Sequence, residues 1–220
     1  MRTNTEYKNA ALAALKGNWA PAALLSVVYL VIAAALEAPS SIVALTSPEK
    51  TMPALNGGSS LIMLLLCPFL VVGTVNAFRL LFERKDTNLL SNTINIGKDN
   101  YLHKLWGVFL MEIYIVLWTF LLVIPGIIKS FSYAMTPYIL DEHPELSANE
   151  AIDKSRAMMR GHKFDLFYLY LSFIGWILLT LITCGIGFIW LYPYLQTATA
   201  AFYYDLKVEN GEAFPEAEIV

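Results

Sequence analysis

Residues 166–204 read LFYLYLSFIGWILLTLITCGIGFIWLYPYLQTATAAFYY, and none of these 39 positions carries a charge. A single helix of that length would measure about 58 Å, which is about twice the apolar thickness of a lipid bilayer. The stretch therefore has to fold back on itself. Glycine permits a tight turn, so we expect the reversal at Cys184-Gly185-Ile186-Gly187. Each half then has about 18 residues, which suits one membrane crossing.

A second apolar region lies near the start of the chain. Residues 17–36 carry no charge, and residues 61–82 form another apolar segment of spanning length. Together they predict a hairpin over about 17–82, closed by a loop at 38–60 that is rich in Pro, Ser and Gly. An alternative interpretation is a cleaved signal peptide, but the polar lead before the apolar run is long and looks helical, which favours a retained span.

The third apolar region is residues 105–140, whose length again requires a reversal. We expect the break at Pro125-Gly126, because proline removes a backbone donor and glycine tolerates a turn. Only 15 residues, 126–140, follow this break. They form either a short crossing or a re-entrant segment that neighbouring helices screen from lipid. The sequence thus contains three apolar hairpins, over about 17–82, 105–140 and 166–204.

The positive charges are strongly sorted along the chain. Thirteen of the fifteen Lys and Arg residues fall in four polar segments, and the two exceptions are Lys50 and Lys129. The four segments are 2–16, 79–104, 154–163 and the tail at Lys207. Lys- and Arg-rich short loops stay in the cytoplasm. Six transmembrane helices with both termini in the cytoplasm place all four segments on that side, and Lys50 and Lys129 on the other.

The polar segments before the hairpins have helical patterns of their own. Thr3-x-x-Glu6 and Ser147-x-x-Glu150 are capping boxes, in which a hydroxyl and a carboxylate satisfy opposing backbone donors. We predict cytoplasmic amphipathic helices over about 4–16, 88–101 and 147–161. One face of the helix 147–161 consists of small and apolar residues, namely Ala148, Ala151, Ile152, Ser155 and Met159. Such a helix either lies in the membrane interface or docks on other cytoplasmic segments.

The two later hairpins resemble copies of one another. A shift of 59 residues brings His103-Lys104 onto His162-Lys163, Gly126 onto Gly185 and Tyr133 onto Tyr192. Apolar stretches of low complexity also give such matches by chance, so duplication and coincidence remain alternatives. If the unit of one cytoplasmic helix and one hairpin is repeated, each copy enters and leaves on the same side, and the repeats are parallel.

Several motifs resemble a known bacterial membrane family. They include Ser132–Leu140, the segment His143–Ile152 and the run Met159-Arg160-Gly161-His162-Lys163. These residues are similar to the domain-of-unknown-function family 975, and a looser similarity exists to the membrane domain of some glycerophosphodiester phosphodiesterases. The resemblance implies a multi-helix protein of the bacterial cytoplasmic membrane without an assigned activity. This chain has no catalytic domain of the phosphodiesterase kind, so the resemblance implies no hydrolysis.

Four polar residues within the apolar regions are candidates for a functional site. Glu112 lies about seven residues into its span, roughly 10 Å below the inner surface, and Asn76 and Arg79 lie at similar or shallower depth. Such groups face the bundle interior, where they serve either as a proton or substrate contact or as a polar clamp between helices. Lys129 is expected in the outer leaflet, extended toward the outer surface or paired with Glu37.

The sequence therefore predicts an all-α, polytopic protein with a single membrane domain over 1–220. No nucleophile elbow, phosphate-binding loop, dinucleotide fingerprint or paired-carboxylate motif occurs in it, and the isolated Cys and His residues form no metal-binding pattern. No basic stripe indicates nucleic-acid binding. We expect a non-enzymatic scaffold without cofactor or metal, with the bilayer and proteins at the cytoplasmic face as partners. The alternative is a small-solute or lipid transporter that uses Glu112.

Overall fold

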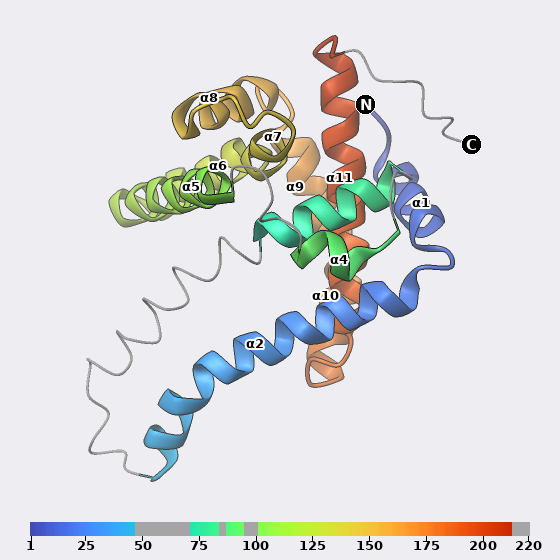
Figure 1. Ribbon diagram of the computed structural model, residues 1–220, viewed down its shortest axis with the longest axis vertical. Coiled ribbons are helices and arrows are strands. Elements are labelled where there is room, and N and C mark those ends of the chain that lie inside the picture. The colour runs from blue at the N-terminus through green and yellow to red at the C-terminus, as the bar shows by residue number, and fades with distance from the viewer. Residues whose placement is uncertain (47–70, 84–86, 95–100, 213–220) are drawn as a thin grey trace.

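The computed structural model describes residues 1–46, 71–83, 87–94 and 101–212, and this part of the chain contains helices and turns but no strand. The expected all-α class is therefore confirmed (Figure 1). In chain order the helices are α1 (Asn4–Leu15), α2 (Trp19–Thr46), the helix Val71–Phe82, α4 (Leu89–Ile94), α5 (Tyr101–Leu121), α6 (Val123–Tyr133), α7 (Thr136–Glu142), α8 (Ala148–Met158), α9 (Lys163–Leu171), α10 (Ile174–Ile182) and α11 (Phe188–Glu209).

Both predicted capping boxes are present. The Glu6 carboxylate accepts from the Thr3 backbone N–H at 2.6 Å, and the Glu150 carboxylate accepts from the Ser147 N–H at 2.7 Å. Each hydroxyl accepts the reciprocal bond from the backbone N–H of its Glu. These bonds satisfy donors that have no partner within the helix, so α1 and α8 start where the sequence predicts. The predicted helix 88–101 corresponds in part to α4, and residues 95–100 lie outside the described part.

The N-terminal region forms a bent pair of helices. Gly17, at φ +85°, turns the chain between α1 and α2 by 100°. α2 then continues to Thr46, so the expected loop 38–60 is wrong for its first nine residues, and the rest of that loop is not described. The apolar run Ile42-Val43-Ala44-Leu45 continues the helix past Pro39. Of the predicted span 61–82, only the helix Val71–Phe82 is described.

The second hairpin turns earlier than predicted. Leu122 is extended, at φ −158° and ψ 132°, and separates α5 from α6, which lie side by side (Figure 1). Pro125 falls in the first turn of α6, where its missing N–H breaks no helical bond. Gly126 permits the close approach of the two helices, since a Cβ there would lie 2.6 Å from the Cα of Thr119. The predicted break at Pro125-Gly126 is therefore wrong by about three residues.

The segment 126–140, expected as one piece, is also divided in two. A break at Ala134-Met135 separates α6 from α7. Ser155 of α8 forms hydrogen bonds with two backbone groups at this break. Its hydroxyl donates to the Ser132 carbonyl at 3.0 Å and accepts from the Met135 N–H at 3.2 Å. With 11 residues, α6 is about 16 Å long, which is half of an apolar bilayer core.

The third hairpin turns where the sequence predicts. Cys184 and Gly185 adopt positive φ values of 50° and 91°, and α11 begins three residues later at Phe188. Thr180 and Gly187 repeat the contact of Thr119 and Gly126: in each pair the Thr hydroxyl donates to the carbonyl four residues earlier at 2.8 Å, and the Gly lies against the Thr backbone. At the turns, the two hairpins therefore correspond at a shift of 61 residues rather than 59.

α8 packs against the α5–α6 hairpin (Figure 1). The whole predicted apolar face of α8 is buried, and Ala151, Ser155 and Met159 are completely inaccessible to solvent. Most of its charged residues are exposed, namely Glu150, Asp153 and Arg156, as is Arg160 just after the helix, whereas Lys154 is half-buried. Of the two expectations for this helix, docking on other segments is the one that the structure supports.

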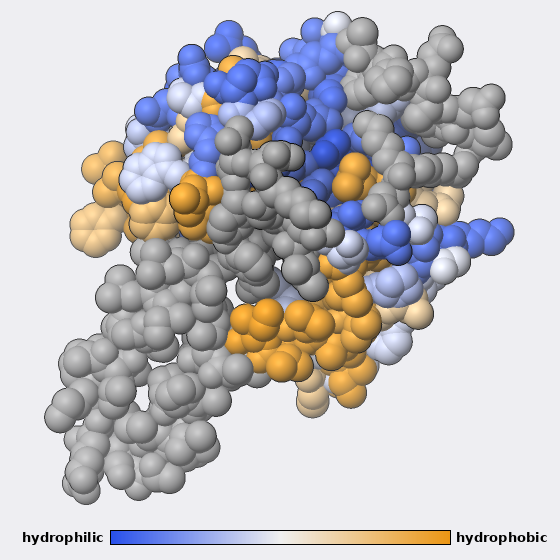
Figure 2. All heavy atoms as spheres, viewed as in Figure 1, coloured by the Kyte–Doolittle hydropathy of each residue, from blue (hydrophilic) through white to orange (hydrophobic). Residues whose placement is uncertain are grey.

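Apolar length supports part of the expected membrane layout. In the described part, Leu102–Leu121 and Lys163–Ile182 are long and apolar enough to cross a membrane, and the bent pair Asn4–Leu15 and Trp19–Ile32 raises the number to three at most. Six spans in three hairpins remain a prediction. Hydrophilic residues gather around α8 and the end of α11, and hydrophobic residues gather around α10 (Figure 2).

Replacing Gly126 with Ala should destabilise the α5–α6 hairpin. The new Cβ would collide with the backbone of Thr119, and relieving the overlap requires the helices to separate, which costs about 1–3 kcal/mol. Gly175→Ala is the matched control, because nothing lies within 4 Å of a Cβ at that position in α10. Thermal unfolding in detergent should show a lower Tm for Gly126→Ala only. Equal Tm values for the two variants would contradict the close packing.

Candidate polar cleft

The described residues enclose an open polar cleft of about 770 Å³ at one end of the bundle. It is formed where the helix Val71–Phe82, α7, α8 and α11 come together. Its lining consists almost entirely of ionisable side chains, namely Arg79, Asp141, Glu142, His143, Lys154, Lys207 and Glu212. The consecutive residues Asp141-Glu142-His143, at the end of α7, form its centre.

Asp141 joins the two ends of the basic segment 79–104, which lie on different helices. Its carboxylate accepts a hydrogen bond from Arg79 Nη2 at 2.5 Å and another from Lys104 Nζ at 2.7 Å. The Asp141 side chain is only 4% exposed. A carboxylate buried to that extent needs charged partners to compensate for its lost hydration. The ion pairs therefore fix the helix Val71–Phe82 and the start of α5 against α7.

Glu142 makes the corresponding connection to α11. It accepts from Lys207 Nζ at 2.6 Å, from the Tyr203 hydroxyl at 2.8 Å and from Arg79 Nη1 at 3.1 Å. Burial alone raises the pKa of Glu142, but the bonds from Lys207 and Tyr203 and the charge of Arg79 outweigh it and hold the pKa below its usual value. Glu142 is therefore ionised at neutral pH, as the two basic partners require.

Arg79 is the cation that both acids share. It is 9% exposed, and besides Asp141 and Glu142 it contacts Glu83 at 3.3 Å and the Asn76 side-chain oxygen at 3.4 Å. The planar guanidinium offers five N–H donors in fixed directions, which suits several carboxylates at once. The structure thus brings together Asn76 and Arg79, two of the four candidate residues from the sequence.

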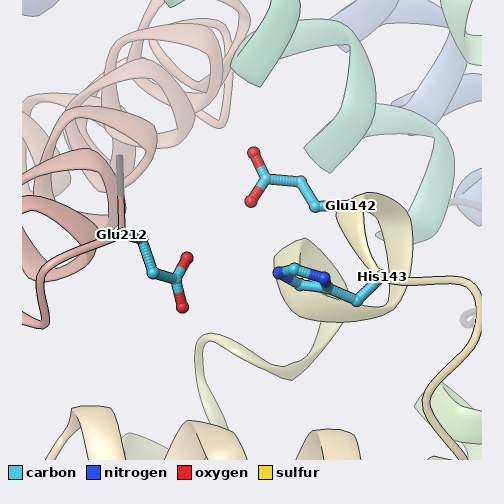
Figure 3. A group of neighbouring side chains, drawn as sticks. All are labelled: Glu142, His143 and Glu212. Atoms are coloured by element: carbon cyan, nitrogen blue, oxygen red, sulfur yellow. The ribbon is translucent and has the colours of Figure 1, made fainter. Parts of the chain in front are cut away.

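Three groups with metal-ligating atoms lie close together in the cleft. A carboxylate oxygen of Glu142, a ring nitrogen of His143 and a carboxylate oxygen of Glu212 lie within 4.8 Å of one another (Figure 3). Lys154 lies beside two of them, 3.0 Å from His143 Nε2 and 2.8 Å from Glu212 Oε1. Its ammonium thus already contacts two of the three candidate ligand groups. The arrangement therefore fits an ion-pair network better than a metal centre.

The other two candidate residues lie apart from the cleft. Glu112 is half-buried on α5 and takes part in an interaction there, but it is not among the described residues that line the cleft. Lys129 lies in a second pocket with Asn149, Asp153 and Arg156 of α8. The expectation that Lys129 and the helix 147–161 lie on opposite sides of the bilayer is therefore wrong, because α6 is short and α8 folds back over it.

The sequence analysis did not identify Asp141 and Glu142 as site residues. They immediately follow the apolar stretch 105–140. Two adjacent carboxylates at the end of an apolar helix are the feature of the sequence that could have identified the site. Their basic partners are 37 to 65 residues distant in the sequence and on different helices, so only the packing of α7 against its neighbours assigns them. Lys207 was recognised as a cytoplasmic charge but not as a ligand of Glu142.

Known proteins offer one point of comparison. Residues 119–210 match a family model described as a protein of unknown function (DUF975). The matched region begins near the end of α5 and includes all of α6 to α11, with Asp141, Glu142 and Lys207 inside it and Arg79 and Lys104 outside. No curated protein and no solved structure matches the chain.

Replacing Glu142 with Gln should destabilise the fold. The change leaves Lys207 and Arg79 near a neutral group in a position where the side chain is only 12% exposed, which costs about 3 kcal/mol. Glu145→Gln is the control, because Glu145 is 65% exposed and its change should cost less than about 0.5 kcal/mol. Chemical unfolding in detergent at pH 7 measures both. Similar losses in the two variants would mean that the Glu142 ion pairs do not hold the helices together.

The effect of Glu142 should also depend on pH in a defined direction. Because the folded-state pKa is lowered, the stabilisation is complete above the unfolded value of about 4.3 and is lost as the pH falls through the folded value. The difference in unfolding free energy between the wild type and Glu142→Gln should therefore be constant from pH 7 to 5 and shrink below about pH 4.3. A difference that grows on acidification would contradict the assignment.

Proposed function

We propose that the chain is a non-enzymatic membrane module of the DUF975 kind, which is anchored by apolar hairpins and presents its charged end to cytoplasmic partners. The observation that carries this proposal is the separation of apolar and charged surfaces. The α5–α6 and α10–α11 turns expose large apolar side chains: Phe120 is 94% exposed and Ile182 78% exposed. Water-facing surfaces seldom carry contiguous apolar patches of this kind, and a bilayer core is the environment that covers them.

The second hairpin supports insertion without full crossing. Between Lys104 and Tyr114, α5 makes polar contacts with α7 and α8. Lys104 donates to Asp141 of α7, and the Tyr114 hydroxyl donates to Asn149 of α8 at 3.2 Å. Within the described part of the chain, the eight residues 115–122 that follow make no polar contact with α7 or α8. They extend over about 12 Å. One leaflet is about 15 Å thick. We therefore propose that α5–α6 enters one leaflet and returns, in place of the two crossings expected from the sequence.

The third hairpin has a polar contact at a comparable distance from its turn. Lys8 of α1 donates to the Ser172 carbonyl at 2.5 Å, where α9 meets α10, and its ammonium lies 4.6 Å from the centre of the Phe173 ring. Ser172 is 12 residues, or about 18 Å, from Cys184 at the turn. A lysine can reach the interface from this depth, so α1 fits a position in the interface plane with the α10–α11 turn deep in the bilayer.

The contacts of the termini support the proposed orientation. Arg2 pairs with Asp205 at 3.3 Å, which fixes the start of the chain beside the last turns of α11. Two predicted cytoplasmic segments, 79–104 and the tail at Lys207, also meet at Asp141 and Glu142 through Arg79, Lys104 and Lys207. The start of the chain, the last turns of α11 and these basic segments thus share one face. The exposed charges of α8 on that face form the surface that we propose for protein partners.

The transporter alternative has less support. It needs Glu112 on a path through the bundle, whereas Glu112 does not line the polar cleft. The charges of the cleft are paired in short salt bridges. A scaffold requires rigid cohesion of the helices on the polar side, and these ion pairs provide it. The proposal therefore assigns the cleft residues a structural role and places the interaction surface outside the cleft.

Single-cysteine labelling tests the proposed layout. In a background without Cys67 and Cys184, a cysteine at position 120 should react with membrane-impermeant maleimide from neither side of the membrane, because the hairpin tip ends within the bilayer. A cysteine at position 160, an exposed position just after the end of α8, should react only from the cytoplasmic side in inverted vesicles. Labelling of position 120 from the outer side would show that α5 crosses completely. Labelling of position 160 from the outer side would overturn the proposed orientation.

A further inference from the structure

A second pocket, of about 380 Å³, lies between the α5–α6 hairpin and α8. Its lining combines aromatic and basic side chains, among them Tyr114, Trp118, Lys129, Tyr133 and Arg156. The Lys129 ammonium lies 4.6 Å from the centre of the Trp118 ring and 5.8 Å from that of Tyr133. Nothing in the proposed scaffold role uses this pocket.

The charges in the pocket favour an anion. Lys129 makes no ion pair with any residue in the described part of the chain, and the charged groups that act on it are the like charges of Arg156 and Lys163. The one acid in the lining, Asp153, is paired with Arg156 at 2.6 Å. Because this pair uses only one of the two Arg156 terminal nitrogens, the guanidinium has further donors to offer. The lining as a whole carries one net positive charge, and Lys163 adds to the field.

The position of the pocket relates it to the membrane. Lys129 is seven residues, or about 10 Å, from the turn at Leu122, and the side chains between are exposed and apolar: Val123 is 63% exposed and Ile124 72% exposed. An anion in the pocket would therefore lie at the level where the apolar tip ends and the charged face of α8 begins. In a bilayer, phosphate groups of lipids occupy this level, with the acyl chains alongside the tip.

We propose that this pocket binds the phosphate headgroup of an anionic glycerophospholipid, with Lys129 and Arg156 as the groups that contact the phosphate. The hydroxyls of Tyr114 and Tyr133 and the Asn149 amide can bond the polar part of the headgroup, and Trp118 covers the glycerol and the start of the acyl chains. The lipid phosphate supplies the negatively charged partner that Lys129 does not have among the described residues. This inference rests on the proposed membrane insertion of the α5–α6 tip.

The test uses the purified full chain in detergent with dioctanoyl phosphatidylglycerol as probe and native mass spectrometry as readout. Wild type should bind one lipid saturably. Lys129→Gln and Arg156→Gln should each weaken binding by about tenfold or more, whereas Lys129→Arg should retain it. Arg160→Gln is the matched control, since it removes an exposed charge from the end of the same region without entering the pocket. Its affinity should stay within about twofold of the wild type.

Two competitors identify the source of the phosphate. Dioctanoylglycerol, which lacks the phosphate, should not displace the bound lipid, and inorganic phosphate should displace it only at concentrations far above those of the lipid. Displacement by phosphate at equal concentration would overturn a lipid site, as would equal binding by Lys129→Gln and wild type. Since the probe is offered in detergent, binding is measured independently of the cysteine labelling, so failure of the headgroup site and failure of the membrane layout are distinguishable.

Discussion

The described structure depends on two adjacent carboxylates that compensate charges from three other helices. Asp141 and Glu142 form ion pairs with Arg79, Lys104 and Lys207. The side chains of all five residues are 4–12% exposed. Removing these groups from water is costly unless each has its partner, so none of the helices can leave the cluster alone without leaving a buried charge behind. Apolar packing is not directional, so by itself it does not specify the orientation of the helices well. The ion pairs supply that specification.

The second constraint is that buried backbone groups need partners within the protein. At the break between α6 and α7, the buried Met135 N–H donates to the Ser155 hydroxyl of α8, and this hydroxyl donates to the Ser132 carbonyl. α8 is therefore more than an amphipathic cover, since its buried hydroxyl allows the chain to change direction at that point. The turn of the hairpin needs small residues for a related reason, because Gly126 and Gly187 allow neighbouring helices to approach a threonine backbone closely.

The sequence predicted what depends on local pattern. The all-α class, both capping boxes, the buried face of α8 and the turn at Cys184-Gly185 follow from residues close together in the chain. The sequence misplaced the turn at Leu122, because proline and glycine occur both in chain reversals and in the first turn of a helix. Only the contact of Gly126 with Thr119 distinguishes these two cases. The Asp141 and Glu142 cluster, which joins residues up to 65 positions apart, depends on tertiary packing that no local pattern contains.

The corrected position of Lys129 strengthens the charge argument on which the topology was based. Sequence alone assigned Lys129 to the face opposite α8, as one of two exceptions among fifteen basic residues. In the structure it shares a pocket with Arg156, so under the proposed layout fourteen of the fifteen lie on the cytoplasmic side. A full crossing by α5–α6 would require this lysine to pass the apolar core, whereas a hairpin that ends within the leaflet leaves it at the interface. The positive-inside rule and the shortness of α6 thus support the same arrangement.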